Sequence, residues 1–161
     1  MTNPPTPRPA VRRLAAPSLV ALLLAVVSTA CGGDASATLT IRGARVSTPA
    51  GSTAAAYFTV TNDTDRADAL TSITADRGLS ASLHSTETDA SGMSTMHDEP
   101  TMAVPAHGAL VLEPGHRHVM LDGAAGLEPG DAVHFTLRFR HAGSRSIVAK
   151  VVTDVREGYG R

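Results

Sequence analysis

Histidine and methionine are the residues of this sequence whose types and spacing could bind a metal ion. His116, His118 and Met120 occur at every second position, so an extended segment places all three on one face. His84 ends an apolar alternating segment and points away from its core face. Met96 lies in an expected loop, residues 86–105, which is too polar to need a methionine for packing. Thioether sulfur selects Cu(I), and imidazole also binds copper. Two histidines with two methionines therefore favour Cu(I) over Zn²⁺, which prefers thiolate, imidazole and carboxylate.

A second group of histidines and methionines lies close to these residues. It is a candidate for a second ion, such as Cu(II), or for assisting metal transfer, and the alternative is that its members are ordinary solvated side chains. The group comprises Met93, His97, Met102 and His116.

Strand-length segments separated by turn residues run from Thr38 onward, without an amphipathic stretch of helical length. The clearest is residues 132–140, in which Val133, Phe135 and Leu137 alternate with polar residues, as in a strand with one buried face. The number and spacing of such segments predict an all-β fold, a Greek-key β-sandwich. The expected strands are residues 38–46, 54–61, 69–74, 79–84, 109–112, 118–121, 132–139 and 146–153.

The first 30 residues predict an export signal. Three arginines precede an apolar stretch, residues 14–27, which is too short for a comfortable membrane span and is followed by small residues. Cys31 directly after Ala30 is typical of a bacterial lipoprotein, in which this cysteine is acylated; cleavage after Ala30 without acylation is the alternative. We therefore expect an extracytoplasmic protein, anchored to the cell membrane through Cys31 or else soluble in the periplasm or secreted.

These features divide the chain into four parts. Residues 1–30 are the lipoprotein-type signal, 31–37 a flexible tether, 38–154 the β-sandwich that carries the metal ligands, and 155–161 a tail.

Composition excludes several classes of function. Removing the three leader arginines from the 14 basic side chains leaves 11 against 15 acidic ones, a balance that argues against binding nucleic acid through its phosphates. The single cysteine, Cys31, lies outside the sandwich, whereas a blue-copper electron-transfer site needs a cysteine ligand. Neither a Gly-x-Ser-x-Gly elbow nor a His-Glu-x-x-His motif occurs, so we expect no enzymatic activity and no catalytic residues.

The histidine and methionine pattern resembles the periplasmic copper chaperones of the PCu(A)C family, which carry His, ten residues, Met, twenty-one residues and His-x-Met. Here twenty-one residues separate Met96 from His118, and Met120 completes the His-x-Met. Eleven residues separate His84 from Met96, one more than in the family, and Met93 is the alternative sulfur ligand. The resemblance extends over residues 38–152 and includes the matching stretches 55–62, 112–115 and 127–131.

The resemblance implies a cupredoxin-like β-sandwich with a partly exposed Cu(I) site at His84, Met96, His118 and Met120. It further implies a copper chaperone that delivers Cu(I) to a protein client, notably during assembly of the copper centre of cytochrome c oxidase. The implied partners are oxidase subunit II or another assembly factor. The alternative is an exported lipoprotein that acts as a binding or structural module without a physiological metal.

Overall fold

The computed structural model describes residues 39–156, which form ten strands and one short 3-10 turn. The predicted signal, the tether with Cys31, and the tail from residue 157 onward lie outside the described residues. The elements are β1 (Leu39–Ser47), β2 (Thr53–Asn62), β3 (Asp68–Ala75), β4 (Ser80–Thr88), β5 (Ser94–Asp98), β6 (Met102–Val104), β7 (Gly108–Val111), β8 (His118–Asp122), η1 (Ala124–Gly126), β9 (Ala132–Phe139) and β10 (Gly143–Val152).

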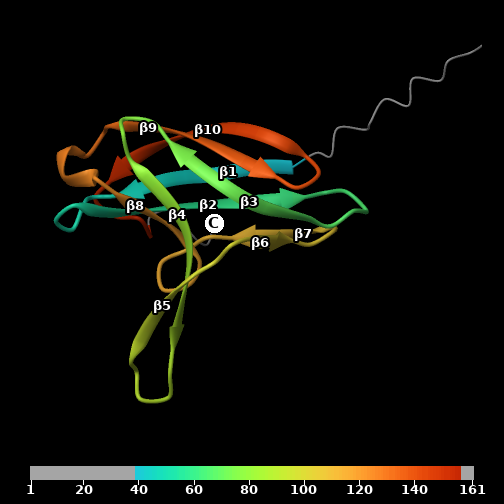
Figure 1. The fold of residues 1–161 in the computed structure, drawn as a ribbon, viewed down its shortest axis with the longest axis horizontal. Helices are drawn as coiled ribbons and strands as arrows, with labels where there is room; N and C mark the ends of the chain where they lie inside the picture. Colours follow the sequence, from blue (N-terminus) through green and yellow to red (C-terminus); the bar gives the residue numbers. More distant parts are fainter. Residues whose placement is uncertain (1–38, 157–161) are drawn as a thin grey trace, which may run out of the picture. The chain divides into compact units, whose positions relative to one another are not determined.

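The strands form one continuous sheet in the order β5-β4-β8-β2-β1-β10-β9-β3-β6, and β7 pairs with the second half of β2 (Figure 1). Every pairing is antiparallel except that of β1 with β10. The predicted all-β class is confirmed, and hydrogen bonds join the layers of the sandwich into a single sheet.

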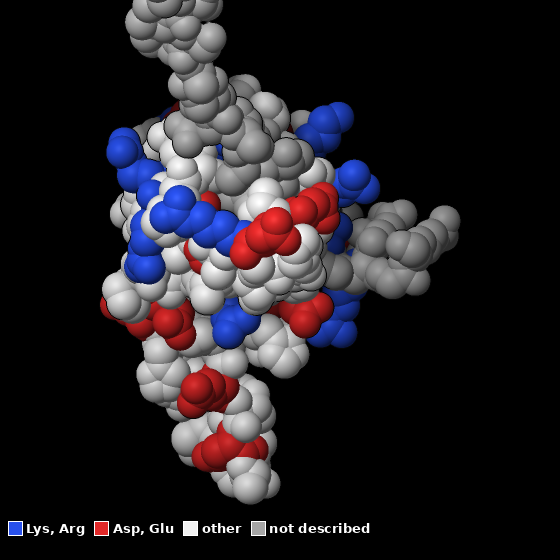
Figure 2. Space-filling model, turned by 90° about the vertical axis from the view of Figure 1, so that its right-hand side faces the viewer, with Lys and Arg blue, Asp and Glu red and all other residues white. Residues whose placement is uncertain are grey.

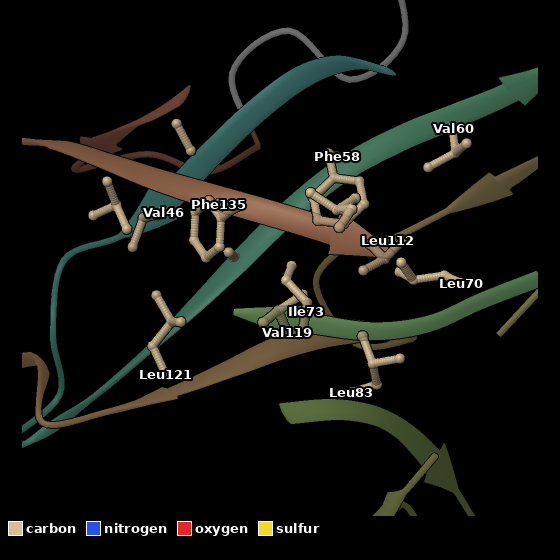
Figure 3. Packing of buried hydrophobic residues seen from close by; sticks show 14 of the residues in the cluster. Val46, Phe58, Val60, Leu70, Ile73, Leu83, Leu112, Val119, Leu121 and Phe135 are labelled. Carbon is tan, nitrogen blue, oxygen red and sulfur yellow. The ribbon is translucent and has the colours of Figure 1, made fainter. Parts of the chain in front are cut away.

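The core follows from the alternation of apolar and polar residues along the strands. In β9 the side chains of Val133, Phe135, Leu137 and Phe139 are all buried, as the sequence predicts. Phe135 and Phe58, on β2, both project into this core, together with aliphatic side chains from most of the other strands (Figure 3). Because aliphatic burial contributes roughly 25 cal/mol per Å² of apolar surface, a core of this kind needs few aromatics.

The polar stretch after residue 85 differs from the prediction. Strand β4 does not end at His84 but continues to Thr88, and β5 and β6 form where a loop was expected. Met102, an expected accessory metal ligand, lies on β6 opposite Leu70 and is 2% exposed within the core. The prediction for Met102 is therefore wrong: its thioether fills core space, a common role of methionine.

The second half of β4 and all of β5 form a hairpin that projects from the rest of the domain (Figure 1). We call residues 85–99 the hairpin arm. Every residue of β5 is exposed, so this strand contributes nothing to the core and depends on its pairing with β4. Two-stranded ribbons are only marginally stable in water, and packing therefore contributes little to the stability of the arm.

Asp68 ties the start of β3 to the turn between β9 and β10. Its carboxylate accepts backbone N–H bonds from Ala69 at 2.7 Å, His141 at 3.0 Å and Ala142 at 2.8 Å. Burial raises the pKa of Asp68, but these hydrogen bonds, aided by the charge of His141, outweigh burial and hold the pKa below its usual 3.8.

Asp68→Ala is expected to destabilise the domain at neutral pH by about 2 kcal/mol, because three backbone donors lose their charged acceptor. Since the folded pKa is the lower one, the stabilisation is complete above the pKa of the unfolded side chain and is lost as the pH falls through the folded pKa. Urea unfolding at pH 7 and pH 2.5 measures this. Asp63→Ala, in an exposed position nearby, serves as the control. If Asp68→Ala lowers the free energy of unfolding by the same amount at pH 7 and at pH 2.5, the assignment is contradicted.

Candidate metal centre

Two histidines meet on the outer face of the sheet. Strand β4 pairs with β8 so that His84 lies opposite His118, and their rings stack with centroids 5.8 Å apart and planes inclined by 18°. The preceding pair, Leu83 opposite Val119, points into the core. Because side chains alternate between the faces of a strand, burial of the leucine and valine forces both imidazoles onto the outer face.

The surroundings of His118 favour a neutral imidazole. The residue is 6% exposed, and its Nδ1 lies 3.1 Å from the backbone oxygen of His116. Since a carbonyl only accepts, Nδ1 donates and the lone pair of a neutral ring is on Nε2. Burial lowers the pKa of His118; the hydrogen bond to His116 raises it and nearby His84 lowers it further. The neutral form, which is the one that binds metals, is therefore favoured.

His84 has polar neighbours at both ring nitrogens. Its Nε2 lies 2.8 Å from Oγ of Ser82, and its Nδ1 lies 3.2 Å from Oδ1 of Asp98, which is directly opposite on β5. The order Ser82, His84, Asp98 is that of a Ser-His-Asp triad. Ser82, however, lies within a regular strand rather than on the strained turn that exposes a nucleophilic serine.

Met120 lies beside the histidine pair. It is opposite Ser82 on β4 and opposite Ala55 on β2, and it is half-buried. This register makes it a diagonal neighbour of His84, and such neighbours are roughly 7–8 Å apart, within reach of a long side chain.

Met96 lies on the other side of His84. Strand β5 places it opposite Thr86, on the same face as His84, and 46% of it is exposed. It is the diagonal neighbour of His84 across β5, as Met120 is across β8. The register thus places all four expected ligands on one face, with His84 between the two methionines.

The turn of the hairpin arm sets this register. Oδ1 of Asp89 accepts hydrogen bonds from Ser91 N at 2.8 Å, Ser91 Oγ at 2.6 Å and Met93 N at 3.0 Å. Gly92 has a φ of 84°, a conformation that favours glycine. These contacts fix a five-residue turn between Thr88 and Ser94, and the turn decides that Met96, rather than Met93, shares the face of His84.

The expected accessory residues do not gather at one place. Met93 and His97 line a cavity of about 210 Å³ on the opposite side of the hairpin arm. His116, expected on the strand of His118, lies instead in the turn before β8 and lines a separate cavity of about 450 Å³. In the part of the chain that the structure describes, no three His, Cys, Asp or Glu side chains are placed to hold a metal ion.

The hairpin arm is negatively charged and contains no lysine or arginine. In Figure 2 the acidic side chains of the arm stand out against the mixed charge of the rest of the surface. They are Glu87, Asp89, Asp98 and Glu99. Sequence reasoning missed the contact of Asp98 with His84, because only the pairing of β4 with β5 reveals it.

The chain matches the LpqE-like lipoprotein family over residues 39–151. The solution structure of Cu(I)-bound DR1885 from Deinococcus radiodurans is 31% identical, with a TM-score of 0.60 over 76% of this chain and 84% of that one. The apo PCuAC domain from PmoF1 is 25% identical, with a TM-score of 0.60 over 72% and 94% of the two chains. The copper-bound PCuAC domain from PmoF2, at 24% identity and a TM-score of 0.58 over 72% and 93%, shares the fold. No curated protein matches.

Asp89→Ala is expected to loosen the hairpin arm without unfolding the domain, because β5 lies outside the core. Amide hydrogen exchange at Ser85, Thr95 and His97 should accelerate roughly threefold to tenfold, as expected when hydrogen bonds at a turn are lost. Asp89→Asn keeps an acceptor and should exchange like wild type. If amide hydrogen exchange in Asp89→Ala is the same as in wild type, the turn does not set the register between β4 and β5.

Proposed function

This chain belongs to the LpqE-like lipoprotein family, and we propose that it is a copper chaperone that binds one Cu(I) ion through His84, Met96, His118 and Met120. The observation that carries the proposal is the stacked pair of His84 and His118, flanked on the same face by both methionines. Its similarity to Cu(I)-bound DR1885 supports the choice of metal.

The donor set favours Cu(I) for chemical reasons. Two imidazoles and two thioethers are uncharged, so the bound ion keeps a single positive charge, and soft sulfur favours Cu(I) over divalent ions. Methionine also suits an exported protein, since an exposed thiolate is oxidised readily. The buried His118 and the half-buried Met120 provide fixed ligands, whereas the exposed Met96 is open to exchange.

This arrangement fits transfer of copper better than catalytic turnover or electron transfer. A protein that hands on a metal needs a ligand that an incoming donor can replace, and Met96 on the hairpin arm satisfies this need. Blue-copper electron transfer requires a cysteine ligand, and the single cysteine, Cys31, precedes the described domain.

The proposed setting is outside the cytoplasm, with the domain anchored to the membrane through an acylated Cys31, a residue outside the described part of the chain. The described residues include no helix of the length and apolarity needed to span a bilayer. The proposed client is a protein of the cytochrome c oxidase copper-centre assembly, such as oxidase subunit II. A second copper ion at Met93, His97 or His116 stays a prediction.

Competition against a colourimetric Cu(I) chelator tests the site. We expect tight binding of one Cu(I), and a loss of affinity on the order of a hundredfold in His118→Ala and in Met120→Ala, since each removes a ligand. His134→Ala is the matched control, because His134 is an exposed histidine paired with Asp76. Wild-type affinity in both ligand variants contradicts the proposal and favours the module without a metal.

X-ray absorption of the Cu(I)-loaded protein tests the contribution of Met96. Two sulfur and two nitrogen neighbours are expected in the wild type and one sulfur in Met96→Ala. Two sulfurs in Met96→Ala would transfer the role to Met93, whose removal in Met93→Ala gives the complementary result. Mass spectrometry of the copper-loaded protein counts the ions and tests the second site.

A further inference from the structure

The two histidines of the site are fixed in different ways. Nδ1 of His118 bonds a backbone oxygen two residues away, a partner that no side-chain substitution removes. Nδ1 of His84 instead faces the carboxylate of Asp98, which lies on the hairpin arm with 89% of its side chain exposed, whereas the side chain of His84 is only 14% exposed. One imidazole is thus oriented by the turn that precedes its own strand, and the other by a neighbouring strand outside the core.

The neighbours of His84 select one neutral tautomer. A carboxylate is only an acceptor, so Asp98 at 3.2 Å favours the proton on Nδ1. The lone pair is then on Nε2, and the Ser82 hydroxyl at 2.8 Å donates to it. In the metal-free protein, therefore, the lone pair on Nε2 of His84 accepts a hydrogen bond from the Ser82 hydroxyl.

We propose that Asp98 is a positioning residue that presents Nε2 of His84 to copper, and that the Ser82 hydroxyl holds this position until the ion arrives. The proposal rests on the proposed function and extends it to two residues that do not bind the ion. Binding then needs no proton transfer, because the proton stays on Nδ1 and the hydroxyl rotates away. A carboxylate behind a ligating histidine also raises the basicity of the ligand.

The position of Asp98 also distinguishes the two histidines during release. Strand β5 is an edge strand that pairs with β4 alone. A client that displaces the hairpin arm therefore moves Asp98 and Met96 away from His84 together. His118 and Met120, on β8 between two paired strands, keep their positions.

Nitrogen NMR of the metal-free protein tests the tautomer without any copper. Wild-type His84 is expected to be protonated at Nδ1. Asp98→Ala should shift His84 toward the Nε2-protonated form, whereas Asp98→Asn, which retains a carbonyl acceptor, should preserve the wild-type tautomer. Unchanged His118 signals confirm that the variants are folded. An unchanged His84 tautomer in folded Asp98→Ala overturns the proposal.

Cu(I) affinity provides a second readout, because substitutions of Asp98 and Ser82 are expected to change the affinity in opposite directions. Asp98→Ala should bind roughly ten- to a hundredfold more weakly, the usual effect of losing a partner behind a ligand, with Asp98→Asn closer to wild type. Ser82→Ala should bind roughly two- to tenfold more tightly, because copper no longer competes with a hydrogen bond.

Glu87→Ala is the matched control, because Glu87 is an acidic residue of the same hairpin arm, opposite Thr95 and on the face away from His84. An equal loss of affinity in Glu87→Ala assigns the effect to overall charge and overturns the positioning role. Weaker binding in Ser82→Ala overturns the placeholder role. If wild-type protein binds no Cu(I), the proposed function fails while the NMR result still decides the tautomer.

Discussion

The antiparallel pairing of β4 with β8 is the constraint on which the rest of the site depends. Leu83 and Val119 are cross-strand partners inside the core, and the next pair along is His84 with His118 on the outside. A slip of one residue would turn an imidazole toward the hydrophobic core and an aliphatic side chain away from it. Packing of Leu83 and Val119 in the hydrophobic core therefore fixes the strand register that brings His84 and His118 together on the other face.

The site combines a rigid half with an exposed half. His118 and Met120 belong to β8, which is paired on both sides, whereas Met96 and Asp98 belong to an edge strand with no buried residue. A site made only of core strands would hold copper firmly but offer an incoming protein little access. A site made only of the hairpin arm would not orient its ligands. The boundary between the two suits a protein that must both bind and release.

The electrostatics of the site are divided in the same way. Burial, aided by nearby His84, lowers the pKa of His118 and so favours its neutral form. The hairpin arm instead carries four carboxylates and no lysine or arginine, so its field favours cations and basic partners near the exposed half of the site. In the proposed copper site, the neutral imidazoles and thioethers would provide the preference for soft Cu(I), while the carboxylates of the arm would add attraction that does not discriminate between metals.

The sequence by itself determined the all-β class, the strand that carries Val133 to Phe139, and the outward direction of His84 and His118, because alternation with a period of two is a local property. It did not predict β5, whose five exposed residues carry no apolar pattern, nor the burial of Met102, which a methionine in a polar stretch does not reveal. The neighbours of His84 were decided only by tertiary structure. Asp98 is fourteen positions away, and only the strand register brings its carboxylate to Nδ1.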